Sequence, residues 1–189
     1  MLKMNNTATT EHRRLFIVEK LPEPLTLASS HLQIFDNYIE NTRLRLRLVR
    51  DPYSNAWTRM LQQRVFPSET DRSVSNLAEI HLNDAEYSLF EKFRGSEIRK
   101  NRYFHEFDHQ LFSFDSYLGN LRGLNTAHVD FDDVGALANF EAPPFAVFEV
   151  TGDPFFDGGN LVSKTFADIQ AEIAKVGATV PAPSELQDE

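Results

Sequence analysis

The stretch NTRLRLRLVRD (residues 41–51) alternates arginine with leucine over most of its length. Arg43, Arg45 and Arg47 are separated from one another by single leucines. Successive side chains of a β-strand point to opposite faces, so this period of two predicts a strand with one cationic and one apolar face. Because the whole chain carries a formal net charge of -9, the cationic face is a local concentration of positive charge that needs an anion.

The composition bounds the class of protein. The chain has 189 residues, of which 41% are hydrophobic and 16 are Phe, enough for one globular domain with a buried core. It has no cysteine, which excludes disulfides and thiolate metal sites. No segment approaches the roughly 18 apolar residues of a membrane helix. We expect a cytoplasmic protein that makes no membrane contact, and its acidic balance argues against coating nucleic acid by bulk charge.

The remaining segments predict mostly strands. Residues 83–93 and 132–140 are expected to be helices, and residues 161–177 form the strongest helical pattern, with Gly177 as its stop. Residues 29–39 fit either a short helix or an extended arm. We expect a disordered lead over 1–10, a single domain over 11–177 and a disordered tail over 178–189. Strands are expected at 12–18, 56–66, 73–82, 96–104, 110–119, 126–133 and 144–153.

This pattern predicts an α+β protein built on an antiparallel barrel or sandwich with peripheral helices. Charged residues alternate with apolar ones in TRLRLR (42–47) and HVDF (128–131). If the sheet closes, such strands would enclose a polar interior, which needs a ligand to compensate its charge.

The segment HEFDH (105–109) matches the His-Glu-x-x-His pattern of zinc hydrolases. That chemistry requires a helix, so that His105 and His109 share one face and Glu106 acts as general base. The flanking sequence is aromatic and strand-like, which favours a polar hairpin connection. A zinc hydrolase stays open as a competing hypothesis.

Several separated stretches resemble the CYTH family, the triphosphate tunnel metalloenzymes. They occur in the family's order and cover most of residues 11–165. The pieces are TRLRLR (42–47), LQQR (61–64), AEIHLNDAEYSLF (78–90), IRKNRY (98–103), FDSYLGNLRGL (114–124), AHVDF (127–131) and EVTGDPFFDGGNL (149–161).

The resemblance implies an eight-stranded antiparallel β-tunnel with peripheral helices, in which cationic side chains grip a phosphate anion. Arginine suits this role because its forked donors match phosphate oxygens. Arg64 stands where the family usually has lysine, so the cation is kept. The implied phosphate-binding residues are Arg43, Arg45, Arg47, Arg64, Lys100 and Arg102.

The resemblance also implies a divalent metal, Mg²⁺ or Mn²⁺, held by acidic residues. The family's first strand reads Glu-x-Glu-x-Lys, whereas the matching positions here are Glu11, Arg13 and Leu15, and Arg13 would repel a dication. The implied ligands are Glu11, Asp130 and Glu149, with Asp115 and His128 as further candidates. Asp115 could equally pair with an arginine.

Two functions follow from the resemblance. The first is a metal-dependent triphosphatase acting on a small phosphate anion, with no catalytic residue assigned. The alternative is a non-catalytic module that binds a polyanion or nucleotide and has an eroded metal site. The family also includes adenylate cyclases, so the fold does not fix the reaction. A homodimer is left open.

Overall fold

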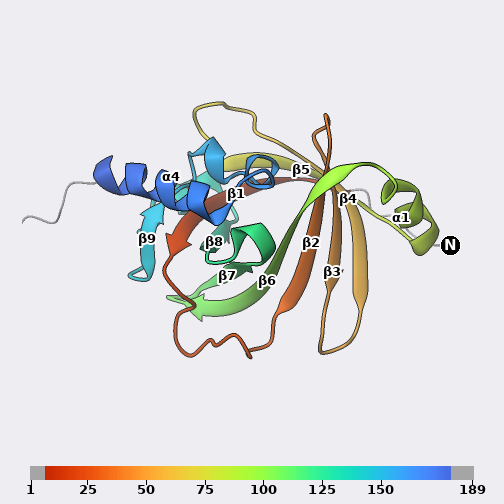
Figure 1. Cartoon of the computed structure of the whole chain (residues 1–189). Helices are drawn as coiled ribbons and strands as arrows, with labels where there is room; N and C mark the ends of the chain where they lie inside the picture. The colour runs from red at the N-terminus through yellow and green to blue at the C-terminus, as the bar shows by residue number, and fades with distance from the viewer. Residues whose placement is uncertain (1–6, 180–189) are drawn as a thin grey trace, which may run out of the picture.

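The computed structural model describes residues 7–179 (Figure 1). Its strands are β1 (Thr7–Val18), β2 (Leu32–Ile39), β3 (Leu44–Arg50), β4 (Trp57–Val65), β5 (Val74–His81), β6 (Gly95–Phe107), β7 (Gln110–Tyr117), β8 (Asn125–Phe131) and β9 (Ala146–Glu149). Its α-helices are α1 (Asp84–Phe90), α2 (Val134–Ala138), α3 (Gly158–Leu161) and α4 (Phe166–Thr179). Two 3₁₀ helices are η1 (Gly119–Leu121) and η2 (Pro154–Phe156).

Within residues 7–179, eight strands close into an antiparallel barrel. They follow the order β5–β4–β3–β2–β6–β7–β8–β1, and the pairing of β1 with β5 closes the ring. The first half of β1 pairs with β5 and the second half with β8, while β9 pairs with its end. The predicted α+β barrel with peripheral helices is therefore confirmed. Figure 1 shows α1 and α4 toward opposite sides of the barrel.

One large apolar cluster lies on the outside of the barrel wall. Phe16, Phe112 and Phe114 are fully buried there, on strands β1 and β7. The segment that joins α2 to β9 covers them with Phe140 and Phe145, whose ring centroids lie 6.1 and 5.2 Å from that of Phe112. Because side chains alternate along each strand, an apolar outer face leaves the inner face for polar groups.

A second apolar cluster forms where β1, β6 and β7 meet the C-terminal helices. It contains Ile17, Tyr117, Leu124 and Leu161, and Ile169 of α4 is fully buried against them. This packing fixes α4 to the barrel. Across residues 7–179, no helix combines the length and the apolar character that crossing a membrane requires.

The structure corrects three expectations about the elements. Residues 7–10 belong to β1 rather than to a disordered lead, because they supply the partner that β5 needs to close the barrel. The ambiguous stretch 29–39 contains β2, a strand. The last helix begins at Phe166 rather than at residue 161, and its pattern continues past Gly177. The rest of the expected lead and tail, residues 1–6 and 180–189, lies outside the described residues.

The start of α4 has a local cause. Thr165 and Asp168 form reciprocal hydrogen bonds, since the Thr165 backbone N–H donates to Asp168 Oδ2 at 2.8 Å and the Asp168 N–H donates to Thr165 Oγ1 at 3.4 Å. This is a capping box, and it begins the helix after Thr165. Helix α1 begins in the same way, with Asn83 and Glu86 as the capping pair.

The segment HEFDH connects β6 to β7 as a tight hairpin. Glu106 pairs with Leu111, and Asp108 and His109 form the turn with φ angles of 47° and 61°. His105 lies on β6 rather than one helical turn from His109. The predicted polar hairpin is confirmed, and the helix that a His-Glu-x-x-His zinc site requires is not formed by this segment.

We predict that Phe112→Ala lowers the free energy of unfolding by about 3–5 kcal/mol, because it empties the centre of the outer aromatic cluster. Urea denaturation measures this loss. Leu111→Ala is the matched control, since Leu111 is the neighbouring residue and is 61% exposed. Equal losses for the two variants would contradict the description of an outer core.

Candidate functional site

The barrel encloses a cavity of about 640 Å³ that is lined mainly by charged side chains. Its volume lies within the range of small-molecule sites. Eight cationic residues and five acidic ones line it, which leaves an excess of three positive charges in a protein of net charge -9. The cations are Arg13, Arg43, Arg45, Arg47, Arg64, Arg72, Lys100 and Arg102, and the acids are Glu11, Asp36, Glu79, Asp115 and Asp157.

The arginine strand β3 contributes two of these cations. Arg47 binds Asp36 of β2 through two hydrogen bonds, from Nε to Oδ1 at 2.6 Å and from Nη2 to Oδ2 at 2.7 Å. Arg45 lies 3.6 Å from the same carboxylate and donates from Nε to Gln62 of β4 at 3.0 Å. Asp36 is only 1% exposed, and the two arginines hold its pKa well below its ordinary value despite the opposing effect of burial.

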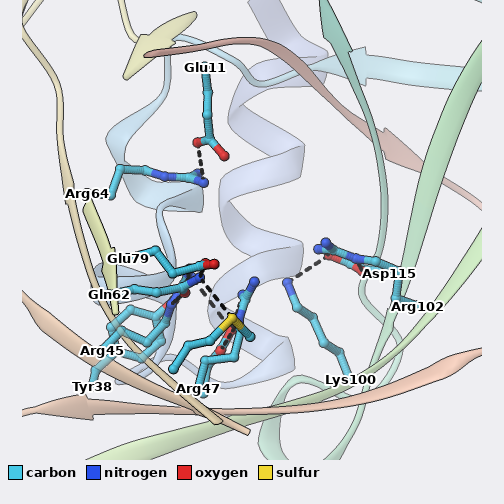
Figure 2. A network of polar contacts seen from close by, with 12 residues as sticks. Glu11, Tyr38, Arg45, Arg47, Gln62, Arg64, Glu79, Lys100, Arg102 and Asp115 are labelled. Carbon is cyan, nitrogen blue, oxygen red and sulfur yellow. Dashed lines mark hydrogen bonds and ion pairs between the residues drawn. The ribbon is translucent and has the colours of Figure 1, made fainter. Parts of the chain in front are cut away.

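The neighbouring strands β6 and β7 repeat this arrangement, with β6 paired to β2. Lys100 and Arg102 of β6 both bind Asp115 of β7, the lysine through Nζ at 2.7 Å and the arginine through two hydrogen bonds of 2.7 Å. Asp115 is 2% exposed. In the structure, Asp115 therefore pairs with cations, which is the alternative to a role as metal ligand. Figure 2 shows Lys100 and Arg47 extending into the same space.

A third group of charges lies on β1 and β4. Glu11 accepts a hydrogen bond from Ser75 at 3.2 Å and forms an ion pair with Arg64 Nη2 at 2.6 Å. Arg13 binds Asp130 of β8 through Nε at 2.6 Å and Nη2 at 3.0 Å. The Nε group of Arg64 is buried and has no partner in the described part of the chain, so this guanidinium retains donor capacity.

Arg43 and Arg72 complete the cationic lining. Arg43 precedes β3 and is exposed, so it lies where the cavity meets solvent. Arg72, on the segment between β4 and β5, forms an ion pair with Asp157 at the start of α3. This contact ties the β4–β5 segment to the short helices that line part of the cavity.

Crowded positive charge changes the protonation of the lumen. Burial, together with the charges of Arg102 and Arg47, lowers the pKa of Lys100 to about 8. Burial and the charges of Arg13, Arg45 and Arg47 lower the pKa of Arg64 to about 9. Both shifts have the sign expected where positive charge is in excess, and an anion placed among these groups would reverse them.

The pKa of His128 is lowered by the same two causes, burial and neighbouring positive charge. His128 is 3% exposed and lines the lumen from β8. Burial and the charges of Arg13 and Arg102 lower its pKa well below the ordinary value for histidine. The imidazole is therefore neutral at pH 7 and adds no charge to the lumen.

The structure does not bring the sequence-derived metal ligands together. Glu149 forms an ion pair with Arg14, whose guanidinium packs over Phe16 and Phe140 in the outer cluster, so Glu149 lies on the far side of the wall from Glu11. Within residues 7–179, no three histidine, aspartate or glutamate side chains converge to form a metal site. The residues present do not fit a divalent metal.

Several lumen residues were not identified from the sequence, among them Asp36, Tyr38, Gln62, Glu79, Arg72 and Asp157. Tyr38 accepts a hydrogen bond from Arg45 at 3.3 Å, and Gln62 joins Arg45 to Glu79. A period-two pattern in LQIFDNYI would have placed Asp36 and Tyr38 on one face of a strand, but the segment also fitted a helix.

Comparison with known proteins gives no match to a family model and none to a curated protein. The solved structures that are similar to this chain include the following two. One, described as the inorganic triphosphatase NE1496, has a TM-score of 0.55 and 24% identity, covering 82% of this chain and 95% of that one. The other, described as the hypothetical protein NE1496, has a TM-score of 0.55 and 21% identity, covering 82% of this chain and 99% of that one. At these identities the similarity shows the fold, and it supports a CYTH-like tunnel.

We predict that Asp115→Asn lowers the free energy of unfolding at pH 7 by about 3–5 kcal/mol, because Lys100 and Arg102 lose their buried counter-ion. The matched control is Glu97→Gln, a change at a half-exposed acid on the same strand as Lys100. Urea denaturation measures both.

The loss should also depend on pH. Neighbouring cations hold the folded-state pKa of Asp115 below its unfolded value, so its stabilising contribution is present above the unfolded pKa of about 3.9 and is lost as the pH falls toward the folded value. The difference between wild type and Asp115→Asn should therefore narrow below about pH 4. A difference that widens in acid would contradict the ion-pair account.

Proposed function

We propose that this protein binds a linear triphosphate-type anion in the lumen of its barrel. The observation that carries the proposal is the excess of cationic side chains, which extend into one cavity mainly from β1, β3, β4 and β6. A triphosphate carries several negative charges along a narrow chain, so it can contact cations from different strands at once. A ligand with a single carboxylate could not contact cations on different strands at once.

The existing ion pairs leave donors for such a ligand. Asp36 occupies Nε and Nη2 of Arg47, and Asp115 occupies the same two nitrogens of Arg102. Within the described residues, neither Nη1 group makes a hydrogen bond. Each carboxylate thus fixes the orientation of a guanidinium whose remaining donors are available to phosphate oxygens.

Enclosure favours a small anion over a nucleic acid. Most of the cationic side chains lie inside the barrel wall, with Arg45, Arg47 and Arg102 only 12–15% exposed. A duplex or folded RNA needs an exposed basic surface. The lumen therefore suits free polyphosphate or the phosphate chain of a nucleotide, with Arg43 at the solvent-facing edge.

Hydrolysis of the bound anion is a second candidate function. It is favoured by the similarity in fold to a structure described as an inorganic triphosphatase. Four of the five acids of this lumen are engaged by arginine or lysine, and Glu79 is engaged by Gln62. Among residues 7–179, the metal-dependent form of that reaction therefore has no ligand set. A phosphate-release assay with tripolyphosphate separates binding with turnover from binding alone.

We predict that Arg45→Ala weakens tripolyphosphate binding by about 10- to 100-fold, because a charged hydrogen bond to phosphate is lost. Isothermal titration calorimetry measures the dissociation constant. Arg99→Ala is the matched control, since Arg99 lies on β6 beside Lys100 and its side chain is 54% exposed. Equal affinities of Arg45→Ala and wild type would sink the proposal.

We also predict that tripolyphosphate affinity falls by about tenfold between pH 7 and pH 9.5, since the Lys100 ammonium loses its proton above its pKa of about 8. A bound anion raises that pKa, so binding takes up a proton in this range and is strongest at lower pH. Lys100→Arg keeps the charge and should flatten the profile. Identical profiles for the two proteins would exclude Lys100 as a contact, because the ligand's own titration is common to both.

A further inference from the structure

Four side chains at one side of the lumen form a chain of alternating charge: Asp130, Arg13, Glu11 and Arg64. Arg13 contributes Nε and Nη2 to both oxygens of Asp130, and its Nη2 lies 3.5 Å from Glu11 Oε1. The other oxygen of Glu11 is engaged by Arg64 at 2.6 Å. A guanidinium therefore lies between the two carboxylates.

A divalent cation between these acids would meet that guanidinium. Mg²⁺ and Mn²⁺ are bound by carboxylate oxygens, and each Asp130 oxygen already accepts a hydrogen bond from Arg13. A metal bound by Glu11 would in addition lie close to Arg64. Like charges at such separations repel strongly where water is partly excluded.

Arg13 is well placed to act on a ligand in the lumen. It is on the inner face of β1, lines the cavity and has a side chain that is 22% exposed. Its backbone N–H donates to Ser73 O at 2.7 Å, which fixes β1 beside the start of β5. The carboxylates of Asp130 and Glu11 hold its head group from two sides, so its position is set before any ligand arrives.

We infer that Arg13 supplies, as a permanent part of the chain, the positive charge that a bridging metal ion would otherwise bring, and that the tunnel binds its anion without divalent metal. This inference rests on the proposed function and narrows its ligand to the metal-free polyphosphate. The cations of the lumen then contact the phosphate oxygens directly.

Added Mg²⁺ should act against binding. The ion associates with free tripolyphosphate and cancels part of its negative charge, so the lumen is offered a less anionic ligand. A site that uses a bridging metal has the opposite response, because the metal completes it. The sign of the magnesium effect therefore separates the two arrangements.

The first test is calorimetric titration of the wild-type chain with tripolyphosphate, in EDTA and in excess MgCl₂ or MnCl₂. We expect binding in EDTA that is weakened several-fold by excess Mg²⁺. Binding that is about tenfold or more tighter with metal would overturn the inference while leaving the proposed function in place. An absence of binding in all conditions would instead overturn the proposed function.

Two substitutions at Arg13 sharpen the test. Arg13→Gln removes the charge with little change in size, and we expect a loss of about tenfold or more in EDTA that metal does not restore. Arg13→Glu adds a carboxylate next to Glu11 and Asp130, so we expect the same loss in EDTA and recovery in MnCl₂. Circular dichroism checks the fold of each variant.

These outcomes are decisive even if Arg13→Glu does not fold. An Arg13→Gln protein that binds tripolyphosphate in EDTA as tightly as wild type would exclude Arg13 from the role. Restoration of Arg13→Gln by Mn²⁺ would indicate a metal site that does not depend on residue 13, which also contradicts the inference.

Discussion

Asp36 and Asp115 neutralise part of the positive charge inside the barrel, and without them Arg45, Arg47, Lys100 and Arg102 would face one another around a cavity of about 640 Å³. Burying a charge is costly unless it is paired. The two carboxylates therefore lower the free-energy cost of burying these cations in the lumen, and they also orient the cations. The lumen still has eight cations and five acids, so it keeps an excess of positive charge. This excess charge attracts an anionic ligand.

The polar lumen also determines where the apolar core can lie. The inner face is charged along much of its length, and Ile98 and Tyr117, which also line the lumen, belong to the apolar cluster at one end of the barrel. The protein places one aromatic cluster outside the wall of β1, β7 and β8, under the segment that leads to β9, and a second where the barrel meets α4. The helices and connections thus add to the limited apolar core that the barrel interior provides.

Much of the fold could be predicted from sequence, because strand alternation is a local signal: Arg45 and Arg47 are on one face of β3, and both line the lumen. The rest depends on pairing between distant strands. Residues 7–10 were expected to be a disordered lead, but they extend β1 and close the barrel against β5. Glu149 matched a family position, but the pairing of β9 with β1 places it beside Arg14 on the outer face. Asp36 was missed because its segment also fitted a helix.

The measurement that tests the central claim most directly is a crystal structure of the wild-type protein with tripolyphosphate. The account predicts one phosphate chain inside the barrel, with its oxygens in contact with cations from both β3 and β6 and with the fold unchanged. A phosphate chain bound on the outer surface, or a lumen that holds only water at saturating ligand, would contradict the assignment of the barrel interior as an anion site.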